Sequence, residues 1–180
     1  MSKRQVFFSF EFNKDAWRAA QVRSMGKVSK DSTLFSDNEW EEVKKKGRKA
    51  IMNWIDSQMR LRSCIVVLIG ESTSTRQWVL YEIKKAYELN KGIAGVYIHG
   101  LKDSQGHQSL RGNNPFDRVY TTNGTPLSKY VQCFDSDCTE SKTVYNDIQD
   151  HIESLIEIAL DNKDNMKRPP RMNAKRGFTV

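Results

Sequence analysis

Trp78 and Glu82 are the two residues whose types and spacing could do chemistry together. They stand four residues apart in a segment with helical periodicity, so they share one face of a helix, about one turn apart. The indole plane could hold a flat cationic heteroaromatic ring, and the carboxylate could stabilise an oxocarbenium ion developing at an adjacent sugar. The spacing by itself is a weak signal, because a packed tryptophan and a solvated glutamate are the commoner occupants of such a helix.

Other kinds of catalytic site lack the residues they require. The sequence contains no glycine-rich loop ending in Gly-Lys-Ser/Thr and no dinucleotide-binding glycine fingerprint. The three cysteines and three histidines show no zinc-ligand spacing, and no histidine falls near a nucleophile in the order of elements. A phosphoacceptor site would need clustered acids, whereas Glu11 stands alone after the first apolar run. We therefore expect no metal and no resident cofactor.

Apolar runs that alternate with amphipathic segments indicate an α/β protein. Four short runs rich in β-branched and aromatic residues are predicted to be strands, at 5–10, 63–69, 93–99 and 129–134. Four segments with a helical apolar period are predicted to be helices, at 15–25, 36–55, 74–90 and 144–160. The polar stretch 27–37 could hold one more short strand. This alternation predicts a parallel sheet of about five strands with helices on both faces.

Two capping boxes predict where helices begin, and one long connection separates the last two predicted strands. Ser36 with Glu39, and Ser74 with Gln77, have the spacing at which side chains satisfy free amides at a helix start, so helices are expected to begin there. The segment 100–128 has no sustained period, and so long a connection within a domain is usually functional or disordered. Ligands of open parallel sheets bind at the carboxyl ends of the strands, so the site is expected there.

The positive charge of the chain is concentrated at its C-terminal end. Of the 180 residues, 1–162 are expected to form one domain, and 163–180 carry six basic residues against one acid, five of the seven net positive charges. Such a segment is predicted to be a solvated, flexible tail; an arm that binds nucleic acid is the alternative. The longest apolar run is far too short to span a bilayer and no signal peptide is evident, so we expect a cytoplasmic protein without membrane contact.

Several segments resemble Toll/interleukin-receptor (TIR) domains. Val6-Phe7-Phe8-Ser9-Phe10 is similar to their first box, and the strand and loop 68–74 followed by the helix 78–83 resemble the catalytic region of members that cleave NAD+. The TIR-like proteins of bacterial Thoeris anti-phage systems are the more similar group, because the resemblance also takes in 76–83 and 114–117. It covers about residues 3–161 and leaves the basic tail unexplained.

The resemblance implies a flavodoxin-like fold and cleavage of the nicotinamide–ribose bond of NAD+, which is then a substrate. Carried over by motif, Glu82 is implied to be the catalytic residue, Trp78 to stack on a base or on nicotinamide, and three further residues to line the pocket: Ser9, Phe10 and Ser72. The product would be a cyclic or modified ADP-ribose messenger that activates a separate effector protein. Self-assembly of the chain on activation is also expected.

One departure and two alternatives stand beside this interpretation. Glu11 follows the first box at a position where relatives often have basic or polar groups, and an inward-pointing acid there would repel the pyrophosphate. A non-catalytic TIR-type module, whose surface mediates assembly, is the main alternative to the enzyme. Nucleic-acid binding through the tail is the other, whereas the enzyme interpretation expects no nucleic-acid partner.

Overall fold

The computed structural model describes residues 4–28 and 37–168, and in this part of the chain four parallel strands form one sheet. In spatial order they are β1 (Val6–Ser9), β2 (Cys64–Ile69), β3 (Gly92–Tyr97) and β4 (Cys133–Phe134). Val6 pairs with Cys64 and Cys64 with Gly92, so the carboxyl ends of the first three strands meet at one edge. These three strands are buried along their whole length, which accounts for their apolar sequences.

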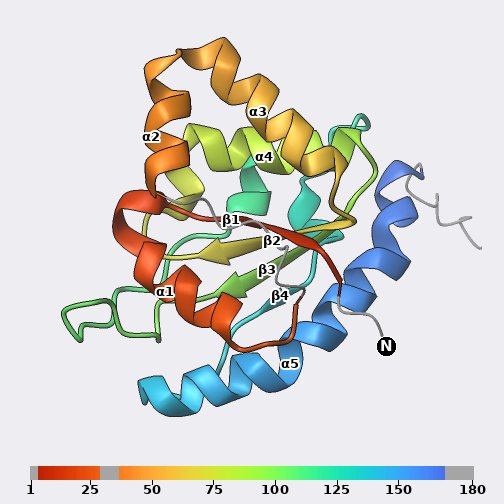
Figure 1. Cartoon of the computed structure of the whole chain (residues 1–180). Coiled ribbons are helices and arrows are strands. Elements are labelled where there is room, and N and C mark those ends of the chain that lie inside the picture. The colour runs from red at the N-terminus through yellow and green to blue at the C-terminus, as the bar shows by residue number, and fades with distance from the viewer. Residues whose placement is uncertain (1–3, 29–36, 169–180) are drawn as a thin grey trace, which may run out of the picture.

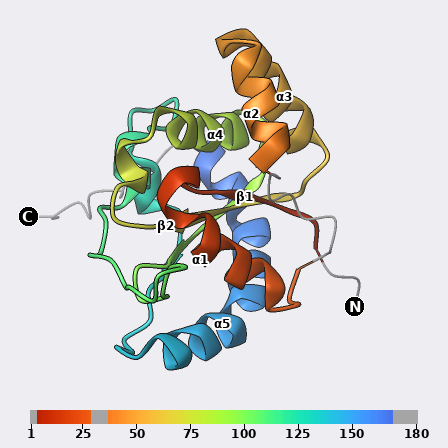
Figure 2. The ribbon, with the colours of Figure 1, turned by 60° about the vertical axis from the view of Figure 1, so that its left-hand side comes forward.

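Helices cover both faces of the sheet, as the alternation of the sequence predicts (Figures 1 and 2). α1 (Phe12–Ser24) and α5 (Ser141–Asn162) lie on one face, and α3 (Arg48–Arg60) and α4 (Gln77–Glu88) on the other. Successive side chains of a strand point to opposite faces, so Val66 packs with α1 and α5 while Ile65 and Val67 pack with α3 and α4. The predicted α/β architecture, a flavodoxin-like parallel sheet between helical layers, is confirmed.

The single helix expected over 36–55 is wrong, because the structure has two helices there. α2 (Asp37–Lys45) ends before Gly47, and α3 begins after it. Gly47 has a φ of +89°, a left-handed conformation that an α-helix does not accommodate and that glycine adopts without strain. Ser36 lies outside the described residues, so its capping box stays a prediction.

The capping box predicted for Ser74 and Gln77 is also wrong. Ser74 lies in a short 3-10 turn, η1 (Thr73–Thr75), and Arg76 occupies the N-cap of α4 with no side-chain hydrogen bond to the helix. Two hydrogen bonds hold the tighter turn: Gly70 N donates to Oγ1 of Thr73 at 2.8 Å, and Arg76 N donates to the Thr73 carbonyl at 3.1 Å. α4 therefore starts at Gln77, three residues after Ser74.

The last strand is shorter than the run expected over 129–134. A 3-10 turn, η3 (Leu127–Lys129), occupies the start of this run. Just after it, the amide of Val131 donates to the carbonyl of Leu127 at 2.9 Å, so this amide does not pair with β3. The additional strand considered within 27–37 falls mostly on residues 29–36, which lie outside the described residues. The described part of the sheet thus has four strands where about five were expected.

The start of the first helix and the connection after the third strand bear on the site. α1 begins at Phe12, earlier than the expected Asp15, because the amide of Asp15 already donates to the Glu11 carbonyl at 2.8 Å. The connection from β3 to β4 contains η2 (Pro115–Arg118) and η3 and is otherwise irregular, as its sequence predicts. Its first part lies beside α1 (Figure 1).

The chain continues from α5 directly into a further 3-10 turn, η4 (Lys163–Lys167). Met166 of this turn is 4% exposed and packs in the core on the α3 and α4 side of the sheet. Nζ of Lys167 lies 3.7 Å from the centre of the Tyr87 ring. The expected division between a domain over 1–162 and a tail over 163–180 stays a prediction, but the first residues of that tail are packed on the domain.

Candidate active site

Glu82 is a carboxylate buried against the end of the first strand. α4 places Val79, Glu82 and Ile83 on its buried side, because residues three and four apart share a helix face. The Glu82 side chain is 4% exposed, and Ser9, the last residue of β1, donates its hydroxyl hydrogen to Oε2. The solvated glutamate that is the commoner occupant of such a helix is therefore excluded at this position.

Burial changes the acidity of this group. Removal from water penalises the charged form and raises the pKa of Glu82 from 4.5 to about 8, and the hydrogen bond from Ser9 opposes this rise only in part. The protein without substrate therefore holds Glu82 mainly protonated at neutral pH. A cation placed beside Glu82 favours the carboxylate and lowers its pKa again. The group is thus set to ionise when a positively charged ring enters.

A pocket of about 180 Å³ opens beside Glu82. Its walls come from the turn after β1, from the start of α4 and from α2. The rings of Phe10 and Phe12 stack with centroids 6.1 Å apart and provide an apolar side to the pocket. The other residues that line it are Glu11, Asn13, Lys44, Arg76, Trp78, Val79 and Glu82.

Trp78 lines this pocket and is half-buried. Its ring meets that of Tyr81 edge to face, with centroids 5.9 Å apart, and the Arg48 guanidinium carbon lies 5.4 Å from the indole centroid. These neighbours orient the indole without enclosing it in the core. The surroundings are suited to a stacking surface for a flat ligand, and that role stays a prediction.

The predicted site residues come together in two ways. Phe10, Trp78 and Glu82 line the pocket directly. Ser9 reaches it through its hydrogen bond to Glu82, and Ser72 through a hydrogen bond that its hydroxyl donates to Oε2 of Glu11. Ser72 itself is absent from the residues that line the pocket. The structure thus brings all the predicted positions to one strand edge, with the two serines behind the lining.

Glu11, the departure from the family pattern, points into the pocket. Its side chain is 6% exposed, and Oε1 forms an ion pair with Nη2 of Arg76 at 2.7 Å. The positive charge of Arg76 offsets the repulsion that an inward acid would exert on a diphosphate. Sequence analysis missed Arg76 as a site residue. Arg76 lies seven residues after the end of β2, beyond η1, and no sequence pattern indicates its contact with Glu11.

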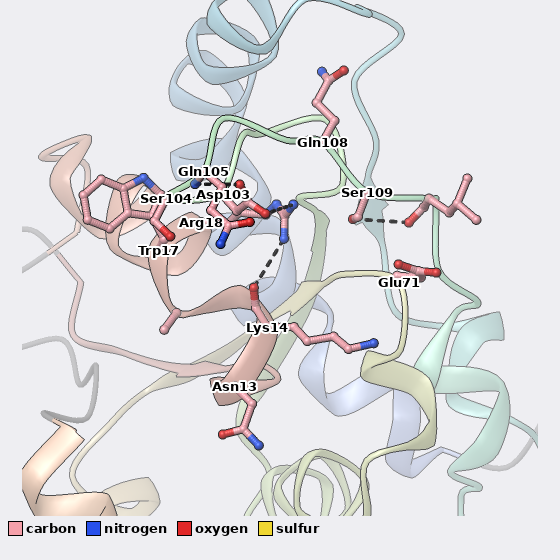
Figure 3. A pocket seen from close by; sticks show the side chains of 12 residues that line it. Asn13, Lys14, Trp17, Arg18, Glu71, Asp103, Ser104, Gln105, Gln108 and Ser109 are labelled. Atoms are coloured by element: carbon pink, nitrogen blue, oxygen red, sulfur yellow. Dashed lines mark hydrogen bonds and ion pairs between the residues drawn. The ribbon is translucent and has the colours of Figure 1, made fainter.

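A second, larger cavity of about 870 Å³ lies beside the first, and Asn13 lines both. It is formed by the first turns of α1, the residue Glu71 after β2 and the connection after β3. Figure 3 shows Trp17 and Gln105 at one side of it and Glu71 and Ser109 at the other. The remaining lining residues are Lys14, Ala16, Arg18, Asp103, Ser104, Gln108 and Leu110. Nothing in the sequence patterns pointed to this cavity.

Two kinds of feature are absent from the described residues 4–28 and 37–168. Within these ranges no group of three or more histidine, cysteine, aspartate or glutamate side chains is placed to hold a metal ion. In the same part of the chain, every helix is too short or too polar to cross a membrane.

The arrangement beside Glu82 can promote the departure of a cationic leaving group from a sugar. One buried carboxyl group stands next to aromatic rings, and once ionised a charge held in such a buried position acts strongly on a developing positive charge. Two-carboxylate sugar hydrolysis needs an acid to protonate the leaving group. A leaving group that is already cationic removes that need, so one carboxylate suffices.

Comparisons with known proteins agree with this chemistry. Residues 7–103 match the family model described as "Thoeris protein ThsB, TIR-like domain". A protein of Bacillus cereus (strain MSX-D12) named "Putative cyclic ADP-D-ribose synthase ThsB1" is 35% identical over 137 residues. The aligned region covers 72% of this chain and 71% of that relative.

Proposed function

This chain belongs to the Thoeris ThsB family of TIR-like domains, and we propose that it cleaves NAD+ at the nicotinamide–ribose bond and makes a cyclic or modified ADP-ribose. The observation that carries the proposal is the buried Glu82 carboxyl group in an aromatic pocket at the strand ends. The similarity to the relative named "Putative cyclic ADP-D-ribose synthase ThsB1" supports the same reaction class.

The reaction needs few protein groups. The bond between the nicotinamide nitrogen and the anomeric carbon breaks, its electron pair leaves with neutral nicotinamide, and positive charge develops on the ribose. Glu82, ionised beside the cationic ring, stabilises that charge, and Ser9 orients the carboxylate. Phe10 and Trp78 contact the flat ring, while Ser72 acts through Glu11.

The second half of the reaction sets the product. Water attacking the anomeric carbon, with loss of a proton, gives linear ADP-ribose. An adenine nitrogen of the same molecule attacking that carbon gives a cyclic product without consuming water. Exclusion of water and proximity of the base favour cyclisation. We infer that the product is a messenger for a separate effector protein, and that the chain self-assembles when it is activated.

Nicotinamide release from NAD+ by the purified protein tests the proposal. We expect turnover by the wild-type protein, loss of most of it in Glu82→Gln, and none of that loss in Glu88→Gln, which alters an exposed carboxylate on the same helix. Mass spectrometry of the products separates linear from cyclic ADP-ribose. A folded, assembled wild-type protein that releases no nicotinamide would favour the non-catalytic module instead.

A further inference from the structure

The pocket beside Glu82 is too small for a whole dinucleotide. Its volume is about 180 Å³, below the roughly 300–1,000 Å³ of pockets that enclose drug-sized ligands. The neighbouring cavity, at about 870 Å³, falls within that range, and Asn13 belongs to the lining of both. The two cavities therefore adjoin at the first turn of α1, where a ligand longer than nicotinamide riboside would extend from one toward the other.

We propose that the larger cavity binds the adenosine half of the dinucleotide whose nicotinamide half lies beside Glu82, with the base stacked on Trp17. This inference rests on the proposed NAD+ cleavage and adds a second binding site to it. The occupant we assign is the other end of the same substrate, because the two cavities adjoin at Asn13.

The walls of the larger cavity have the chemistry that a purine nucleoside needs. Trp17 is 58% exposed although it is a large aromatic residue, and it stands at one side of the cavity next to Gln105 (Figure 3). An indole plane binds a base by stacking, and the amide of Gln105 can donate to and accept from its edge. An exposed Leu110 adds apolar surface on the wall formed by the connection after β3.

The cavity is formed before any ligand binds, because one buried arginine fixes its rim. Arg18 is 4% exposed and forms an ion pair with Asp15 at 2.9 Å. Its Nε donates to the Leu101 carbonyl at 2.8 Å and its Nη2 to the His107 carbonyl at 2.9 Å. The two hydrogen bonds connect α1 to both ends of the 101–107 segment. Ligand binding therefore needs to order little backbone, which lowers its entropic cost.

Charges along the path fit a diphosphate between the two ends. Lys14 lines the larger cavity and Arg76 the smaller one, on either side of the shared Asn13. The acids nearby are Glu11, which is paired with Arg76, and Glu71 and Asp103 in the larger cavity. Asp103 lies 3.8 Å from Nη2 of Arg18, so Lys14 is left to balance Glu71 or to meet a phosphate.

The test compares NAD+ with nicotinamide mononucleotide, which has the same scissile bond and no adenosine. Loss of a base–aromatic stack weakens binding by a factor of roughly 5 to 150, so Trp17→Ala should raise the KM for NAD+ by about that factor. Its kcat/KM for nicotinamide mononucleotide should not change, and Trp17→Phe should recover part of the affinity for NAD+. Tyr120→Ala is the matched control, because Tyr120 is 57% exposed and lines neither cavity.

A KM for NAD+ that is the same in Trp17→Ala and wild type overturns the inference, as does an equal loss for both substrates. Failure of the proposed reaction is a separate result, in which wild-type protein cleaves neither substrate. Binding of adenosine monophosphate, measured by calorimetry, then decides the inference without catalysis. We expect wild type and Tyr120→Ala to bind it and Trp17→Ala to bind it far more weakly. Equal affinities, or no binding to wild type, would refute the site.

Discussion

Replacing Glu82 with glutamine should make the protein more stable and less active at once. Glutamine keeps the shape of the side chain and can accept the Ser9 hydroxyl, but it has no charge to be removed from water. The pKa of Glu82 is about 8 in the folded protein against an ordinary value of 4.5, a difference of about 3.5 pH units. At about 1.36 kcal/mol per pH unit, ionisation of the buried group destabilises the folded state by up to ~5 kcal/mol.

The dependence on pH follows from the direction of this difference. Because folding raises the pKa of Glu82, the wild-type protein has its full stability below about pH 4.5 and loses it as the pH rises through about 8. Relative to Glu82→Gln, the free energy of unfolding of the wild type should be lower by ~1 kcal/mol at pH 5, ~3 kcal/mol at pH 7 and ~5 kcal/mol at pH 9.

Urea unfolding of both proteins at these three pH values measures the effect. Glu88→Gln is the control, because Glu88 is exposed and its ion pair with Lys85 at 3.2 Å lies at the surface. Such a pair contributes about 0–1 kcal/mol, so this variant should show no comparable trend with pH. A difference between Glu82→Gln and wild type that stays constant from pH 5 to 9 would refute the argument from burial.

Activity should move in the opposite direction. Loss of one fixed charge that stabilises a transition state lowers kcat by ~10²–10³, so Glu82→Gln should lose nearly all nicotinamide release. In the wild type, kcat/KM should rise with pH and level off above about 8, since it reports ionisation of Glu82 in the free enzyme. The corresponding rise in kcat should occur at a lower pH than the rise in kcat/KM, because the bound cationic nicotinamide ring lowers the pKa of Glu82. A flat kcat/KM between pH 6 and 9 would contradict the assignment.

Three further changes test other parts of the structure. Trp78→Ala should lower stability by less than the ~3–5 kcal/mol typical of a buried tryptophan and alter the ratio of cyclised to hydrolysed product; a thermal melt and mass spectrometry of the same preparation measure both. Truncation after Arg168 should leave the melting temperature and turnover unchanged, whereas truncation after Asn165 removes the buried Met166 and should cost about 1.5–3 kcal/mol by urea unfolding. Gly70→Ala should cost about 1–3 kcal/mol in the same assay, because its Cβ would lie 2.1 Å from Oδ2 of Asp15.

The sheet and its helical layers could be predicted because their signal is local. Runs such as Cys64–Ile69 are apolar throughout, as a parallel strand buried on both faces requires, and α5 repeats its apolar residues with a helical period. The errors arose where a single backbone conformation overrides a pattern. Gly47 interrupts an apolar face that is continuous in the sequence, and hydrogen bonds around Thr73 displace the helix start expected at Ser74.

Only the part of the site that lies close together in the sequence could be predicted from spacing. Glu82 and Trp78 share a helix and could be found by spacing, and the serines were placed by resemblance to a family. The pair of Glu11 with Arg76 joins two loops 65 residues apart, and no periodicity reports such a contact. The cavity at Trp17 depends on how α1 packs against the connection after β3. Arg18 holds the two together by hydrogen bonds to backbone carbonyls, and because every residue has such a carbonyl, the sequence does not reveal these bonds.

The position of α5 has a consequence for the order in which the protein matures on the ribosome. This last long helix supplies most of the apolar cover over Val66, Leu68, Ala94 and Val96, and Arg4, just before β1, pairs with its Glu157 at 2.9 Å. Chains emerge at about 5–20 residues per second, so for seconds after β1 to β3 are synthesised that face of the sheet has only α1 to cover it. The sheet that carries the pocket is therefore fully covered on both faces only after α5 has been synthesised. Fragments that end before α5, at Glu140, should therefore lack an organised site and should not release nicotinamide from NAD+.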